Sequence, residues 1–113
     1  MMTIELTRYT CPDCGGAIER IVDGTLLQFK CRVGHLYSPL SALNTHHDRE
    51  ENTIWTAAVL LEEGAEMAEE LASTESGELA ERLTKTAEQK RALANRVRQI
   101  AHEFPATIPS TSH

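Results

Sequence analysis

Aromatic side chains are scarce in this sequence. They make up 4% of its 113 residues, so few large rings are available to fill a core. Small domains bury a smaller fraction of their surface than large ones, and those with a thin core commonly need a bound metal or a second subunit. The shortage of aromatic residues therefore predicts that part of the chain depends on such a support.

Long apolar runs are also missing. No stretch approaches the roughly 18 apolar residues that a membrane span needs, and the N-terminal MMTIELTRYT lacks the apolar segment and cleavage site of a signal peptide. We therefore expect a cytoplasmic protein that does not interact with a membrane. In a reducing compartment, clustered cysteines indicate a metal site or catalysis rather than disulfide bonds.

An excess of positive charge is absent as well. The net charge is −6, and residues 1–38 contain four acidic and four basic residues. The rest of the chain therefore holds 13 of the 17 acidic and seven of the 11 basic residues. Binding to a phosphate backbone relies on a basic excess. The charge distribution thus disfavours nucleic acid as the partner.

Three cysteines and a histidine form the pattern Cys11-x2-Cys14-x16-Cys31-x3-His35. Two close pairs with this separation are typical of zinc ribbons, in which four thiolate or imidazole ligands surround the metal as a tetrahedron. The glycines of CPDCGG, and Gly34 in CRVGH, permit the tight turns that such a site needs. We expect one structural Zn²⁺ per chain, held by Cys11, Cys14, Cys31 and His35.

Other roles for these residues are less consistent with their surroundings. A CxxC redox site normally precedes a helix in a βαβ unit, whereas glycines and a strand-like run follow Cys14. A catalytic zinc keeps one position open for water, and four protein ligands leave none. His46 and His47 could compete with His35 for the metal, but we expect both to be solvated residues near the start of a helix.

Sequence motifs of common enzymes are missing. The chain contains no G-x-S-x-G, no phosphate-binding glycine loop and no H-E-x-x-H. We therefore expect no enzymatic activity.

Residues 1–38 have the pattern of a small β module. The run TIELTRY alternates loosely, and AIERIV and TLLQFK are strand-like runs separated by Asp23-Gly24, a dipeptide typical of a tight hairpin turn. The last of these runs ends at Cys31, so the turn brings the two cysteine pairs to one side. We expect a zinc-ribbon-like module over residues 1–38.

Residues 39–104 have helical periodicity. Ser38 and Pro39 are suitable as the N-cap and first residue of a helix, and STESG (73–77) interrupts the helix and offers a new Ser/Thr cap. Pro105 ends the second helix. We expect an antiparallel helical hairpin over residues 39–104 and a disordered tail over residues 105–113, which together with the β module gives an α+β protein.

Apolar residues form a wide face on both expected helices. On the first helix the apolar residues form two adjoining rows. On the second helix they form one row, which we expect to be the seam, the line along which the two helices touch. Alanines recur every seven residues beside this row. The rows are Ile54, Ala58, Leu61, Ala65, Ala68 and Ala72; Ala57, Leu60, Met67 and Leu71; Leu79, Leu83, Leu93, Val97, Ile100 and Phe104; and Ala80, Ala87, Ala94 and Ala101. Such a face is wider than one partner helix needs, so we expect a homodimer that associates through the helices. The glutamates of residues 62–70 should form a solvated face opposite to it.

Two stretches resemble the C-terminal extension of bacterial chemotaxis-type protein-glutamate methylesterases. These stretches are YTCPDCGGAIERIVDGTLLQFKCRVGHLYSPLSAL and ENTIWTAAVLLEEGAEMAEELA, and together they cover about residues 9 to 72. The extension has the pattern CPxCGG…LxFxCRVGHxYS…LL, followed by a helix of the ALWxALRxLEE type. The most specific part of the likeness is CRVGHLYS. The matching residues are Cys11, Cys14, Gly15, Gly16, Phe29, Cys31, Arg32, Val33, Gly34, His35, Tyr37, Ser38, Trp55, Ala58, Leu61, Glu62 and Glu63.

The resemblance implies an accessory module of bacterial signal transduction that binds another protein, and a signalling protein is the expected partner. The catalytic domain of the methylesterases is not part of this chain, Ile54 replaces the usual leucine before the tryptophan, and the second helix matches weakly.

Two other functions stay open. One is a nucleic-acid-binding zinc ribbon with Arg8, Arg20, Lys30 and Arg32 as contacts. The other is a redox-responsive switch in which thiolate oxidation releases zinc.

Overall fold

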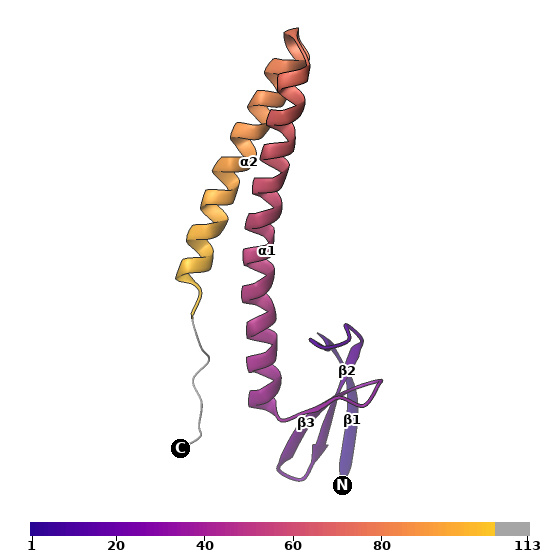
Figure 1. Cartoon of the computed structure of the whole chain (residues 1–113). Coiled ribbons are helices and arrows are strands. Elements are labelled where there is room, and N and C mark those ends of the chain that lie inside the picture. The colour runs from indigo at the N-terminus through magenta and orange to yellow at the C-terminus, as the bar shows by residue number, and fades with distance from the viewer. Residues whose placement is uncertain (106–113) are drawn as a thin grey trace. The chain divides into compact units, whose positions relative to one another are not determined.

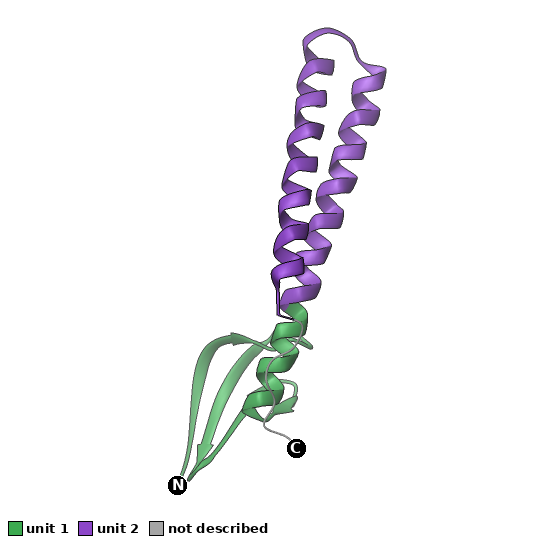
Figure 2. Ribbon diagram, turned by 90° about the vertical axis from the view of Figure 1, so that its left-hand side faces the viewer, with its two compact units in different colours: residues 1–49, 106–113 green, residues 50–105 purple. Residues whose placement is uncertain are grey.

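The computed structural model of the protein describes residues 1–105. They form two compact units, residues 1–49 and residues 50–105 (Figure 2). The expected disordered tail lies outside the described residues, apart from Pro105, which follows the last helix. Within the described part of the chain, no helix is both long enough and apolar enough to cross a membrane.

The first unit contains a four-stranded antiparallel sheet in which strands adjacent in sequence are adjacent in space (Figure 1). Its strands are β1 (Met2–Thr10), β2 (Ala17–Asp23), β3 (Leu26–Cys31) and β4 (Leu36–Tyr37). The predicted turn between β2 and β3 is confirmed. Asp23 pairs with Leu26, and Gly24 has a φ of 64°, which glycine adopts without strain. The sheet followed by two long helices confirms the α+β class.

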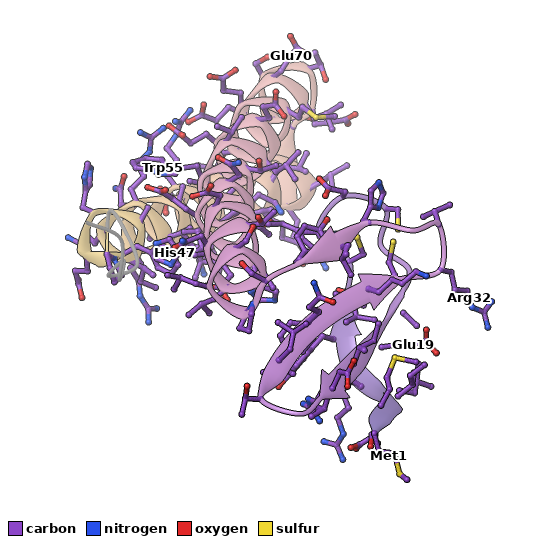
Figure 3. All side chains as sticks on the ribbon, turned by 90° about the horizontal axis from the view of Figure 1, so that it is seen from below. Met1, Glu19, Arg32, His47, Trp55 and Glu70 are labelled. Atoms are coloured by element: carbon purple, nitrogen blue, oxygen red, sulfur yellow. The ribbon has the colours of Figure 1, made fainter. Side chains whose placement is uncertain are left out.

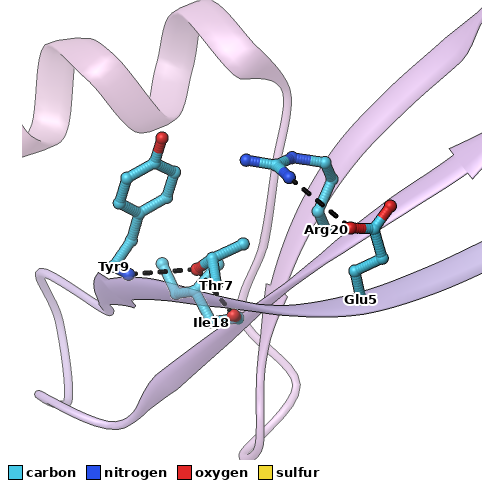
Figure 4. A network of polar contacts seen from close by, with 5 residues as sticks. All are labelled: Glu5, Thr7, Tyr9, Ile18 and Arg20. Atoms are coloured by element: carbon cyan, nitrogen blue, oxygen red, sulfur yellow. Dashed lines mark hydrogen bonds and ion pairs between the residues drawn. The ribbon is translucent and has the colours of Figure 1, made fainter.

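The pairing of β1 with β2 is interrupted between Leu6 and Thr10. There the Thr7 hydroxyl donates a hydrogen bond to the Ile18 carbonyl oxygen (2.8 Å) and accepts one from the Tyr9 N–H (3.0 Å; Figure 4). A side chain thus replaces ladder hydrogen bonds at the irregular position. The two strands consequently stay connected up to the loop that follows β1.

A small core lies on one face of this sheet. Ile18, Tyr37 and the first and third cysteines are buried, and Phe29 and Ala42 pack against them. Ile18 is paired with Cys31 across β2 and β3, and Phe29 with Tyr37 across β3 and β4, so these side chains share one face. Because two of the core residues are cysteines, the core of this unit and its candidate metal site are one structure.

Helix α1 (Pro39–Thr74) begins at the predicted residue. The Ser38 hydroxyl accepts a hydrogen bond from the Ser41 N–H (3.3 Å), and Pro39 occupies the first helical position, where an N–H donor is not needed. The helix starts in the first unit, where Ala42 packs against the core, and its later turns belong to the second unit.

Helix α2 (Gly77–Glu103) runs back alongside α1 (Figures 1 and 2). The helices are separated within STESG as predicted, and a serine of this stretch, Ser76, occupies the N-cap position, although its side chain forms no capping hydrogen bond. Gly77 has a φ of 70°, so the conformational freedom of glycine makes this turn. At its other end α2 stops before Pro105, and the Phe104 N–H donates to the carbonyl oxygens of Ile100 and Ala101.

Alanines form the seam between the two helices. Every buried hydrophobic residue between positions 50 and 105 is an alanine: Ala58, Ala65, Ala68, Ala87, Ala94 and Ala101. The expectation that the leucine row of α2 forms the seam is therefore wrong for Leu79, Leu93 and Ile100, which are 45 to 53% exposed. Small residues in the contact line let the helices approach closely, and the larger side chains beside them then lie at its edge.

The glutamates of α1 do not all lie on a solvated face opposite the seam. Glu62 forms an ion pair with Arg98, and Glu69 forms one with Arg91 at 2.5 Å. Both pairs join α1 to α2, so these two glutamates border the seam, and the sequence-based expectation is wrong for them.

Candidate metal centre

The first cysteine pair lies in a tight loop after β1. The Cys11 N–H donates to the Gly16 carbonyl oxygen, and the Gly15 N–H donates to the Cys11 carbonyl oxygen, both at 2.7 Å. Gly15 has a φ of 75°, a conformation that other residues rarely adopt. This double hydrogen bond folds the loop so that Cys11 and Cys14 face the same point.

The second pair lies in a similar turn between β3 and β4. The Cys31 N–H donates to the His35 carbonyl oxygen (3.0 Å), and the His35 N–H donates to the Cys31 sulfur (3.3 Å). Gly34, with a φ of 102°, permits the turn. The Arg32 side chain extends away from the strands (Figure 3). The turn thus brings Cys31 and His35 close together and leaves its middle residues in solvent.

The structure brings the four side chains predicted as zinc ligands together. One ligand atom from each of Cys11, Cys14, Cys31 and His35 lies within 4.8 Å of all the others. The Cys14 and Cys31 sulfur atoms are 3.7 Å apart, and His35 Nδ1 is 3.6 Å from the Cys11 sulfur and 3.1 Å from that of Cys31.

These distances suit a tetrahedral zinc ion. With Zn–S bonds of about 2.3 Å and Zn–N bonds of about 2.0 Å, the edges of the tetrahedron measure roughly 3.8 Å between sulfur atoms and roughly 3.5 Å between sulfur and nitrogen. Two of the three separations agree with these edges, and the third is shorter by about half an ångström. All three cysteines are free, and a sulfur–sulfur distance of 3.7 Å is far longer than a disulfide bond. The cluster could therefore hold a metal ion.

The four residues differ in their exposure. Cys11 and Cys31 are buried, whereas Cys14 and His35 are exposed. Two ligand positions thus belong to the core of the sheet unit, and two face solvent.

The surroundings of the Cys11 thiol favour its ionisation. Burial raises its pKa, but a hydrogen bond with the Tyr37 hydroxyl and others from the backbone N–H groups of Cys14 and Asp13 outweigh burial and lower the pKa from 9.0 to about 6. The thiolate is the form of cysteine that binds metals. The surroundings of Cys11 therefore favour the ligating form before any metal arrives.

Neighbouring groups also shift the pKa values of the other three candidate ligands. Burial raises the pKa of Cys31, but the backbone N–H groups of His35 and Val33 lower it below its usual value. For Cys14, the Gly16 N–H favours the thiolate, yet burial and the other two sulfur atoms together raise the pKa. Hydrogen bonds with the two buried cysteines raise the pKa of His35. Negative charge thus concentrates on the buried pair, where a cation would be attracted.

Three residues outside the ligand set support it. The Tyr37 hydroxyl donates to the Asp13 carboxylate and lies 3.4 Å from the Cys11 sulfur, and Arg49 donates to the Cys11 carbonyl oxygen at 3.3 Å. The hydrogen bond to Asp13 raises the pKa of Tyr37, so its hydroxyl stays protonated. Sequence reasoning did not assign roles to Asp13 and Arg49, because 24 or more residues separate them from their partners.

The other three histidines of residues 1–105 lie outside the cluster. His46 is exposed, as expected, whereas the expectation of a solvated His47 is wrong, since only 5% of it is exposed. His47 lies on α1 (Figure 3) and is not part of the metal cluster. His102 contacts the Trp55 ring edge-on, with 5.3 Å between ring centroids.

The basic residues considered as nucleic-acid contacts do not share one face of the sheet. Arg20 is paired with Phe29, and Lys30 with Glu19, across β2 and β3. Because neighbouring residues of a strand point to opposite faces, Arg20 and Lys30 lie on opposite sides of the sheet. Arg20 also forms an ion pair with Glu5 at 4.0 Å (Figure 4).

Comparison of the chain with protein-family models, with curated proteins and with solved structures finds no match. The likeness to the methylesterase extension therefore stays a prediction based on motifs.

Proposed function

We propose that the protein is a non-enzymatic interaction module in which Cys11, Cys14, Cys31 and His35 hold one structural Zn²⁺. The convergence of the four ligand atoms within 4.8 Å, with the Cys11–His35 and Cys14–Cys31 separations close to the edges of a zinc tetrahedron, carries this proposal. The metal would join the loop after β1 to the turn before β4 and so stabilise a unit whose aromatic content is low.

Ligand chemistry favours zinc over other metals. Thiolates select soft or borderline cations, and a set of three thiolates and one imidazole is a common structural zinc site. Four protein ligands complete the tetrahedron, so no position is left for a reacting water. The site therefore serves folding and not catalysis.

We assign the interaction role to the helical hairpin. Large apolar side chains remain exposed on both of its helices, which is unusual for a surface without a partner. The likeness of the CRVGHLYS motif to the methylesterase extension supports a role in bacterial signal transduction with a signalling protein as the partner. A neighbouring gene for a receptor, response regulator or methylesterase would support this assignment.

The metal content of purified variants tests the zinc site. The native chain should carry one zinc per chain by elemental analysis. Cys31→Ser and His35→Ala should lose it and lose the amide NMR dispersion of residues 9–37, because the metal supplies much of the folding energy of small zinc domains. His46→Ala is the matched control and should retain the metal. One zinc per chain in Cys31→Ser would show that the ligand set is wrong.

The exposure of Cys14 favours a second function, a redox-responsive switch. Its sulfur lies 3.7 Å from that of Cys31 and is accessible to an oxidant. Hydrogen peroxide would oxidise the two thiols to one disulfide and be reduced to two waters, and the metal would be released. Peroxide treatment with a colorimetric zinc chelator should then report a stoichiometric release. A site that keeps its zinc under peroxide would refute the switch.

A further inference from the structure

The two flanks of the α1–α2 seam differ in chemistry. On one flank, ion pairs join Glu62 to Arg98 and Glu69 to Arg91. Each of these residues follows a seam alanine by four positions, on both helices. Successive residues of a helix are about 100° apart, so residues that precede the alanines by one position lie on the opposite flank. The ion pairs therefore identify one flank of the seam, and the residues one position before the seam alanines identify the other.

This opposite flank is apolar and exposed. Met67 on α1 and Leu93 and Ile100 on α2 each precede a seam alanine by one residue. Leu60 and Leu71, seven positions before and one helical turn after Met67, extend the row on α1, and Leu79, fourteen positions before Leu93, extends it on α2. We name these six residues the apolar flank: Leu60, Met67, Leu71, Leu79, Leu93 and Ile100. They are 45 to 64% exposed, so large side chains from both helices form one surface that lacks a cover.

Charges of opposite sign border the apolar flank. On α1 its outer border carries Glu63 and Glu70, which follow Leu60 and Met67 by three positions. On α2 the outer border carries Arg82 and Arg96, which follow Leu79 and Leu93 by three positions, and ends at Glu103, which follows Ile100. The α1 border is therefore acidic, and the α2 border is basic up to its C-terminal Glu103.

We propose that the apolar flank binds the apolar flank of a second copy of this chain. This inference deepens the proposed interaction function and rests on it. The two hairpins would form a four-helix bundle whose two-fold axis runs parallel to the helices, with α1 of each copy against α2 of the other.

The charged borders select this arrangement. With α1 against α2 of the partner, the acidic border of each copy meets the basic border of the other, and Glu63 lies at nearly the same height as Arg96 of the facing helix. The alternative two-fold axis would place α1 against α1 and α2 against α2. Like charges would then meet at both borders, which opposes association.

Lys90 is the charged side chain that crosses the apolar flank. A Cβ added at Gly64, which precedes the seam residue Ala65, would lie 3.1 Å from Lys90 Cδ and 3.6 Å from its Nζ. The lysine stem therefore covers the glycine, and its ammonium group lies next to the flank. In the bundle this charge would lose part of its hydration, which weakens the dimer without preventing it.

Sedimentation equilibrium of the full zinc-loaded chain tests the proposal. The native protein should form dimers at micromolar concentration. Leu93→Glu should weaken the dimer at least tenfold, because it buries an unpaired charge, and Lys90→Met should strengthen it. The matched control is Val59→Glu, since Val59 is 48% exposed but lies one position after Ala58, away from the flank. It should leave the dimer unchanged.

Circular dichroism and zinc content of the same samples separate the possible failures. A native chain that binds one zinc and stays monomeric overturns the dimer and leaves the zinc site intact. Equal weakening by Leu93→Glu and Val59→Glu, with unchanged helix content, also overturns it. Glu63→Arg and Arg96→Glu should each weaken the dimer about threefold, and the double variant should recover it. Failure to recover would refute the α1-to-α2 arrangement.

Discussion

At the scale of single residues, the candidate metal centre joins groups that are far apart in sequence. Tyr37 is the clearest case, since its hydroxyl reaches both Asp13 and the Cys11 sulfur. Its ring is part of the core that also contains Ile18 and Cys31. One side chain thus fixes the position of the first ligand relative to β4.

Replacing Tyr37 by phenylalanine should weaken metal binding while keeping the core filled. Residues that orient ligands typically contribute about 10- to 100-fold to metal affinity. We expect a loss in this range for Tyr37→Phe, measured by competition with a zinc-binding dye. The matched control is Tyr9→Phe, because Tyr9 is 52% exposed and packs against Phe29 through its ring. Equal affinities of the two variants would contradict the role of the hydroxyl.

At the scale of elements, the hairpin is organised by side-chain size. Alanines occupy the contact line, and the ion pairs and leucines lie on either side of it. A hairpin of this kind tolerates large residues at its edges but not in the line itself.

Ala87→Leu should therefore destabilise the hairpin. Ala87 is 1% exposed and contacts Ala65 and Ala68, so added methyl groups must push the helices apart. Overpacking of this kind costs about 1–3 kcal/mol. Urea unfolding followed by helical circular dichroism gives the difference. Ala92→Leu, at an exposed position of the same helix, should be nearly neutral. A similar cost for both variants would argue against a tight seam.

The Glu69–Arg91 pair gives the hairpin a pH dependence. The hydrogen bond and charge of Arg91 lower the pKa of Glu69 below its usual 4.5. A lowered pKa in the folded state means that the contribution is complete above pH 4.5 and is lost as the pH falls through the folded value. Both residues are exposed, so salt should reduce the effect. Thermal unfolding from pH 6 to 3 should show a shallower acid decline in Glu69→Gln than in the native chain. Parallel curves would exclude a contribution from the pair.

Periodicity predicts elements but not which of two adjoining rows faces the partner. The strands β2 and β3, their Asp23-Gly24 turn and the start of α1 followed from local patterns. Strand β4 did not, because two residues carry no periodicity. The leucine and alanine rows of α2 lie next to each other on one face, and the distance between helices decides which is buried. The four candidate ligands could be chosen from their spacing alone, whereas the hydrogen bond between Tyr37 and Asp13 could be identified only in the folded chain.

At the scale of the whole molecule, the two compact units depend on different interactions. The core of residues 1–49 contains two of the candidate ligands, while the hairpin of residues 50–105 is held by alanine packing and ion pairs. Loss of one unit should therefore leave much of the other.

Metal removal and hairpin disruption should have separate effects. A chelator should remove the NMR dispersion of residues 9–37 and retain most of the helical circular dichroism, because no hairpin residue is a candidate ligand. Leu61→Asp should do the reverse, since it places a charge in the partly buried row of α1 and leaves the zinc bound. A single transition that removes both signals after chelation would contradict this independence.

The alanine seam also sets how the hairpin responds to temperature. Unfolding normally raises the heat capacity by about 12–15 cal/mol/K per residue, mainly because apolar surface becomes hydrated. Alanine exposes little such surface, and the leucines of the apolar flank are about half exposed to water before unfolding begins. The heat-capacity increment per residue of an isolated hairpin should thus be small and its stability curve flat. Burial of those leucines in an assembly would raise the heat-capacity increment and make the stability curve steeper. Calorimetry at two protein concentrations should therefore measure this change in the heat-capacity increment.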